Sequence, residues 1–228
     1  MVRALYILLC FLMVGTVSAQ TRQYAVSFVP CYGDNILTAG DTYAAAGIDT
    51  VQVTTLRFYI SGIELMRQET SVWKEANSYH LLDMEEPSSM HLALNIPNGL
   101  AFDAIKLRLG IDSITNVSGA MGGELDPTKG MYWSWQSGYI NFKLEGTSPA
   151  CATRKHEFQF HLGGYAGAQN SMQTVVLKVN DKDGVAISLD IKKFLSGIDL
   201  HTTNSIMIPG PNAVALSRKV VGSFSIGP

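Results

Sequence analysis

The stretch Tyr139-Ile140-Asn141-Phe142-Lys143-Leu144-Glu145 alternates apolar and polar side chains from Ile140 onward. Successive side chains of a β-strand point to opposite faces, so a period of two is typical of a half-buried strand. The pattern assigns one face to the core and the other to solvent, with Ile140, Phe142 and Leu144 on the first and Asn141, Lys143 and Glu145 on the second. An apolar strand face must be covered by a second layer, so the stretch predicts a layered β-sheet fold.

Other segments share this character, being rich in β-branched and aromatic residues and bounded by turn residues: 24–29, 51–65, 79–82, 104–111, 156–162, 174–180 and 185–191. The linker 180–184, with its Asp183-Gly184 end, predicts a hairpin between the last two. Helix signals are confined to 190–196 and to a C-terminal helix over 213–223 capped by Asn212. The sequence thus predicts an all-β, single-domain antiparallel β-sandwich or flattened barrel with one or two short helices, including a C-terminal one.

Composition argues against several classes of protein. The chain has 228 residues, with 17 Lys and Arg against 19 Asp and Glu and a net charge of −2. Nucleic acid is therefore not an expected partner, because phosphate binding needs a basic surface. Hydrophobic residues make up 46% of the chain, which excludes a disordered protein.

The N-terminus has the three parts of a secretory signal peptide: Arg3, an apolar run over 4–14, and the small-residue site Val17-Ser18-Ala19. Residues 1–19 are predicted to be removed after Ala19, leaving a β-domain over 20–228 in the periplasm or secreted. The apolar run is shorter than the ~20 residues of a spanning helix, and no membrane span is expected in the mature chain. An uncleaved anchor is the alternative.

Removal of the signal peptide also removes Cys10, which leaves Cys31 and Cys151. An even pair of cysteines in an oxidising compartment predicts a disulfide, which typically stabilises a fold by ~2–4 kcal/mol. Two free thiols or ligation of a soft metal are the alternatives.

The segment 112–137 is long for a loop and ends in the dense aromatic run Met131-Tyr132-Trp133-Ser134-Trp135. Loops of this length are usually functional or disordered, and the aromatic residues indicate order. Trp133 and Trp135 are one residue apart, so in an extended chain they share a face and can frame an aromatic site. Ordinary core filling is the alternative.

The sequence lacks the common catalytic motifs, including Gly-x-Ser-x-Gly, His-Glu-x-x-His, Cys-x-x-Cys and a phosphate loop, so no enzyme is predicted. Two histidines are candidate metal ligands. His161 alternates away from Phe158 and Phe160 near a strand end, and His80 follows Tyr79 in a short strand. A neutral imidazole at either position can bind a borderline metal, and the alternative is a histidine that only makes a structural hydrogen bond.

Four segments, in this order, resemble the MbnP family of exported bacterial proteins, some of which are associated with copper and methanobactin: 56–63, 107–111, 131–139 and 158–163. The Trp-Ser-Trp-x-x-Gly-Tyr and Phe-His-Leu-Gly blocks are the specific part of this resemblance. Residues 207–214 resemble the branch of the family found in Bacteroidetes-like bacteria. The resemblance covers residues 24–224.

The resemblance implies an all-β periplasmic protein that binds copper near a modified tryptophan. In relatives, a MauG-type di-haem enzyme, similar to cytochrome c peroxidases, converts a tryptophan to kynurenine. Trp133 or Trp135 matches the tryptophan motif, and His161 matches the motif histidine. Relatives from methane oxidisers commonly carry Leu-Asn-His after the Leu-Arg-Leu-Gly strand, whereas this chain has Ile114-Thr115-Asn116-Val117, so a potential copper ligand is absent.

Two other functions compete with copper binding. Carbohydrate stacking needs both indoles exposed on a flat face with polar neighbours such as Gln136 and Asn141. A structural or protein-binding domain instead predicts a buried indole pair and a hydrogen-bonded His161.

Overall fold

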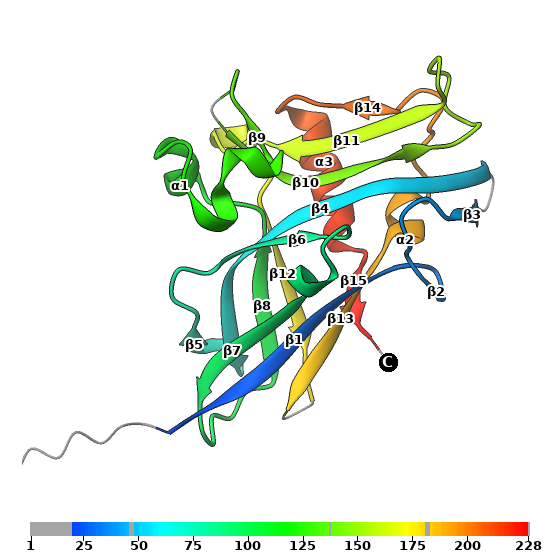
Figure 1. Ribbon diagram of the computed structural model, residues 1–228. Helices are drawn as coiled ribbons and strands as arrows, with labels where there is room; N and C mark the ends of the chain where they lie inside the picture. Colours follow the sequence, from blue (N-terminus) through cyan, green and yellow to red (C-terminus); the bar gives the residue numbers. More distant parts are fainter. Residues whose placement is uncertain (1–19, 46–47, 137, 181–182, 228) are drawn as a thin grey trace, which may run out of the picture.

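The computed structural model describes residues 20–45, 48–136, 138–180 and 183–227 (Figure 1). The predicted signal peptide over 1–19 lies outside these residues. Among the helices of the described chain, none is long and apolar enough to cross a membrane. The described chain folds into two curled β-sheets and a few short helices, which confirms the predicted fold class.

The smaller sheet is built around the first strand, β1 (Thr21–Tyr32), which pairs with three partners. These are β2 (Asn35–Ile36), β7 (His91–Pro97) and β13 (Gly184–Asp190), and β13 in turn pairs with β15 (Phe224–Ile226). The β1–β13 pairing is parallel. A parallel pair needs a long connection, and here residues 33–183 lie between the two strands. Alternation within each strand does not reveal which strands pair.

The larger sheet is built on β4 (Ile48–Arg67), the long strand that crosses Figure 1. Its main path runs through β12 (Gln173–Lys178), β8 (Ala104–Leu109), β4, β10 (Gly138–Thr147), β11 (Glu157–Gly163) and β14 (Ser205–Ile206). The short strands β3 (Thr42–Ala45), β5 (Thr70–Lys74) and β6 (Tyr79–Asp83) also pair with β4, and β9 (Tyr132–Trp133) pairs with β10. The β11–β14 pair is parallel, so the sheets are mixed rather than purely antiparallel.

The main core lies between the two sheets. Phe58 of β4 packs against Phe28 of β1 at a ring-centroid distance of 6.1 Å and against Phe142 of β10 at 6.3 Å. Helix α2 (Ile191–Leu195) adds Phe194, 5.5 Å from Phe142. Helix α3 (Pro211–Val221) packs on β11 and β12. Phe142 and Leu144 of the predicted apolar face are buried in this core, whereas Ile140 is buried in a second core.

A second, smaller core lies on the other face of the large sheet, beneath the predicted long loop. The described part of that loop, residues 112–136, contains helix α1 (Ser113–Val117) and β9. The cluster consists of Tyr59, Leu81, Ile111, Leu125, Met131, Trp133, Tyr139 and Ile140. Tyr59 alternates with Phe58 along β4, so one strand supplies side chains to both cores.

Asn141 is buried, with 1% of its surface exposed, although alternation predicts a solvent-facing side chain. The pairing of β10 with β11 shifts between Ile140 and Phe142, which is the signature of a β-bulge. Asn141 Oδ1 accepts a hydrogen bond from Ile111 N at 2.9 Å, and its Nδ2 donates to Ser171 Oγ at 2.9 Å. The bulge turns a nominally polar position into a bridge between β10 and the end of β8.

Two local predictions are wrong. No hairpin joins 174–180 to 185–191, because β12 pairs with β8 and β13 pairs with β1 and β15; residues 181–182 of the linker lie outside the described residues. Asn212 does not cap the C-terminal helix, which begins at Pro211 after Gly210. Proline is well suited to the first helical position, and that preference sets the boundary here.

The predicted disulfide is also wrong in this structure, since Cys31 and Cys151 are both free thiols. Cys31 lies on β1 opposite Asp190, whereas Cys151 is buried in the main core after β10. Burial raises the pKa of both thiols, and the charges of Asp190 and Asp34 raise that of Cys31 further. Both side chains therefore favour the protonated form.

Candidate functional site

The two tryptophans of the aromatic motif lie together but differ in exposure. Their ring centroids are 5.6 Å apart with an interplanar angle of 42°. Trp133 is 7% exposed and belongs to the second core, while Trp135 is 61% exposed. Sequence spacing predicted that the pair is close but could not assign one indole to the core and the other to the surface.

A glycine on the neighbouring strand makes room for Trp133. A Cβ at Gly163 would lie 2.5 Å from Trp133 Cζ3, so only glycine fits beneath the ring. Gly163 is two residues from His161 along β11, and side chains two apart in a strand share a face. Trp133 therefore lies over the same outer face of the large sheet as His161.

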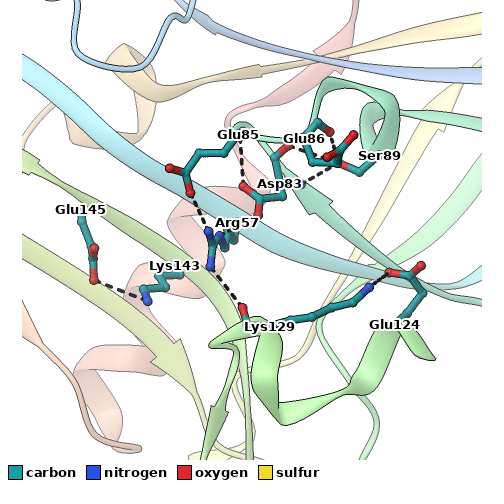
Figure 2. A network of polar contacts seen from close by, with 9 residues as sticks. All are labelled: Arg57, Asp83, Glu85, Glu86, Ser89, Glu124, Lys129, Lys143 and Glu145. Atoms are coloured by element: carbon teal, nitrogen blue, oxygen red, sulfur yellow. Dashed lines mark hydrogen bonds and ion pairs between the residues drawn. The ribbon is translucent and has the colours of Figure 1, made fainter. Parts of the chain in front are cut away.

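Arg57 of β4 connects the loop that carries the tryptophans to the large sheet (Figure 2). Its Nη1 donates to the carbonyl oxygen of Lys129 at 3.1 Å. Its Nε lies 2.7 Å from Asp83 Oδ2 and its Nη2 2.5 Å from Glu85 Oε2. Lys129 in turn pairs with Glu124 through Nζ and Oε2, 3.0 Å apart. The guanidinium thus links β4, the end of β6 and the loop.

Tyr139 and Asn116 hold the loop at its other end. Asn116 Oδ1 accepts from Tyr139 N at 2.8 Å, and its Nδ2 donates to the carbonyl oxygens of Ile111 and Asp112, both at 3.0 Å. The Tyr139 hydroxyl donates to the carbonyl oxygen of Leu125 at 3.0 Å and accepts from Met121 N at 3.0 Å. Asn116 therefore has a structural role here.

His161 is buried and bonded to a carboxylate that sequence reasoning did not single out. Its Nε2 lies 2.6 Å from Glu145 Oε1, and Lys143 Nζ lies 3.6 Å from the same oxygen (Figure 2 shows the Lys143–Glu145 contact). Lys143 is directly opposite His161, and Glu145 is the next residue on that face of β10. Alternation placed both on one face, but only the register brings them to His161.

The environment of this pair favours a neutral imidazole beside an ionised carboxylate. Burial lowers the pKa of His161, and this outweighs the hydrogen bond that His161 makes to Glu145, which raises it. Burial alone would raise the pKa of Glu145, but the His161 hydrogen bond and the charge of Lys143 bring it below its ordinary value. Because an ionised carboxylate only accepts hydrogen bonds, Nε2 carries the proton of the neutral imidazole, and Nδ1 is the nitrogen with a free electron pair.

These shifts predict how stability depends on pH. The unfolded chain binds a proton at His161 below about pH 6.5, whereas the folded chain resists it, so the free energy of unfolding should fall as pH drops below that value. Urea unfolding of the wild type and of His161→Gln measures the effect. The variant should lose less stability than the wild type between neutral and mildly acidic pH, and parallel pH profiles would contradict the assignment.

His80 does not join His161. Its Nε2 lies 2.8 Å from Glu75 Oε2, which also accepts from Ser78 Oγ. His80 precedes the core residue Leu82 by two positions, so it shares the inner face of the sheet, opposite His161. Within the described residues, no group of three or more His, Cys, Asp and Glu side chains is placed to hold a metal.

The fold and this site together define a class: a single-domain β-sandwich protein with a paired-tryptophan loop over one outer sheet face. The chain belongs to the MbnP family, because the MbnP family model matches residues 21–208. A solved structure, MbnP from Methylosinus trichosporium, is similar in fold, with a TM-score of 0.64 and 18% identity over 86% of this chain and 87% of that one. A comparison with curated proteins finds no significant match.

Proposed function

We propose that this protein is an exported, periplasmic member of the MbnP family that is itself the substrate of a partner oxidase. In this proposal a MauG-type di-haem enzyme converts Trp133 or Trp135 to kynurenine, and copper binds beside the modified residue at His161. The chain contributes no catalytic group. The single observation that carries the proposal is the contact between an exposed and a buried indole on the His161 face of the sheet.

The chemistry requires an oxidant that acts from outside the chain. The indole gains two oxygen atoms, is opened, and loses one carbon as formate on hydrolysis, which is a four-electron oxidation. The electrons pass to the haem enzyme and from there to hydrogen peroxide, which is reduced to water. Trp135 is accessible to such a partner, and its contact with Trp133 offers a path to the buried ring.

The surroundings favour oxidation of the indoles over the nearby phenols. Tyr59 and Tyr139 donate their hydroxyl protons to the carbonyl oxygens of Glu124 and Leu125. Burial raises the pKa of both phenols. A tyrosine loses its proton when it is oxidised, and a peptide carbonyl is a poor base, whereas an indole can lose an electron first.

The donor set at His161 fits a copper site with coordination positions left for water better than one filled by protein ligands alone. His161 is neutral and Glu145 is ionised, but the Nε2 that faces Glu145 carries the imidazole proton, so copper would displace that proton to bind both side chains. Water or an external ligand would complete the coordination, and the neighbouring charge of Lys143 opposes a cation. Copper, when bound, would supply a redox-active ion held by His161 and Glu145.

Copper binding is tested by equilibrium dialysis of the mature protein followed by metal analysis. We expect no more than one copper ion per chain and its loss in His161→Ala. The matched control is His91→Ala, because His91 is exposed on β7 and contacts Ser27 instead. Unchanged stoichiometry in His161→Ala would remove this residue from the site.

Oxidation is tested by intact mass measurement. Protein isolated from its native host is compared with the same chain made in a host that lacks di-haem oxidases. We expect the native material alone to show the mass gain of one added oxygen and one lost carbon. Identical masses would overturn the proposal.

The carbohydrate-binding alternative is not supported by this site. A flat sugar platform needs two exposed indoles and accessible polar neighbours. Trp133 and Asn141 are both buried, so the surface offers one indole and no adjoining amide from Asn141.

A further inference from the structure

Helix α1 buries its polar side chains and exposes its apolar ones, which is the reverse of an ordinary surface helix. Its polar residues Thr115 and Asn116 are buried, with 8% and 2% of their surfaces exposed. Its apolar residues Ile114 and Val117 are 81% and 74% exposed. A helix that packs only on its own protein turns its apolar stripe inward, so this arrangement needs another explanation.

The buried face of α1 is explained by its role in holding the loop. Asn116 bonds Ile111, Asp112 and Tyr139, as described above. Thr115 N and Oγ1 both donate to Asp112, and Tyr79 donates to the same carboxylate. These hydrogen bonds fix the helix without any help from Ile114 or Val117. The exposed apolar pair therefore has no role in folding that the structure shows.

Two more exposed apolar side chains belong to the same loop. Met121 is 45% exposed, and its backbone is held by the Tyr139 hydroxyl. Trp135 follows β9, and β9 pairs with the start of β10. At this point of β10, Tyr139 N donates to Asn116 Oδ1 of α1. Figure 1 shows α1 and β9 at the same end of the large sheet. We call Ile114, Val117, Met121 and Trp135 the loop patch.

We propose that the loop patch is the surface on which the partner oxidase docks, through an apolar area around its haem edge. This inference rests on the proposed oxidation of the tryptophan pair. Electron transfer weakens steeply with distance, so the oxidant must bind where Trp135 reaches the surface. The centres of protein interfaces are depleted in charge and enriched in aromatic residues and Met, and the loop patch has that composition. Exposed apolar side chains that are gathered on one loop commonly mark binding sites.

The test replaces both helix residues and leaves the tryptophans in place. The variant Ile114→Asp/Val117→Asp puts two charges on the docking surface, and its side chains are exposed, so the fold should be kept. The control is Ile36→Asp/Val176→Asp, which changes two exposed apolar residues on β2 and β12. If the aspartate variant melts earlier than the control, Ile114→Thr/Val117→Thr replaces it.

Two rates are measured for each protein. The first is the initial rate of kynurenine formation after induction in the native host, followed by mass spectrometry. The second is tryptophan oxidation in the purified protein by a diffusible photogenerated ruthenium(III) complex, which needs no docking. We expect the first rate to fall at least about tenfold in the helix variant and not in the control, because charges are costly at a desolvated interface. The rate of tryptophan oxidation by the ruthenium complex should be equal in the wild type, the helix variant and the control.

The outcomes separate the two proposals. Kynurenine formation in the helix variant at the wild-type rate would overturn the docking surface while leaving the proposed function intact. Absence of kynurenine in the wild type, despite oxidation by ruthenium, would overturn the proposed function and the docking surface with it.

Discussion

Replacing Gly110 by Ala is expected to lower the free energy of unfolding by about 2–6 kcal/mol, combining the costs of backbone strain and of overpacking. Gly110 has a φ of +111°, which side-chain-bearing residues rarely adopt. An added Cβ would lie 2.3 Å from Asn141 Cγ. Asn141 cannot move away without losing its hydrogen bonds to Ile111 and Ser171.

Urea unfolding measures this loss, with Gly119→Ala as the matched control. Gly119 also has a positive φ, of +85°, but an added Cβ there would have no neighbour within 4 Å. The control should lose only the cost of a left-handed backbone, about 1–2 kcal/mol. If the two variants lose equal stability, the packing of Asn141 against Gly110 does not hold the junction between β8 and β10.

Replacing both members of the tryptophan pair, in Trp133→Phe/Trp135→Phe, is expected to abolish kynurenine formation. Phenylalanine keeps an aromatic ring in the second core but is far harder to oxidise than an indole. Some loss of stability is expected because the smaller ring leaves space above Gly163. Protein from the native host is analysed by mass spectrometry.

The matched control is Trp73→Phe, which removes the third tryptophan, on β5. Trp73 packs against the main core rather than the loop. The control should gain mass as the wild type does. Persistent mass gain in the double variant, or its loss in the control, would place the modified residue outside the pair.

Much of the strand framework follows from local pattern. Each predicted strand segment overlaps a strand of the structure, because alternation and β-branched residues report directly on a half-buried sheet. The short helix after Asp190 is found as well, since that side chain accepts from Lys193 N as an N-cap. Strand β7 was missed, although Leu92, Leu94 and Ile96 alternate along it.

The remainder depends on which strands are neighbours, and a single sequence does not contain that information. The parallel β1–β13 pair, the bulge at Asn141 and the absent disulfide all involve residues far apart in the chain. Alternation predicts the face of Asn141 correctly only for a regular strand, and the bulge breaks that regularity.

The candidate site was predictable in its residues but not in its geometry. Trp133, Trp135 and His161 were singled out from their motifs, and the structure brings Trp133 and His161 to one face through Gly163. The Glu145 carboxylate was missed because it lies on β10 and contacts His161 on the paired strand β11, and the sequence alone does not show that pairing. His80 was placed in a strand correctly, but the inward direction of its side chain separates it from His161.

Peptide mapping of the mature protein from its native host tests the central claim most directly, because it locates the modification on individual tryptophans. The account predicts kynurenine on the peptide that carries Trp133 and Trp135, with Trp73 unmodified. Intact indoles at both positions of the pair, or a modification confined to Trp73, would contradict it.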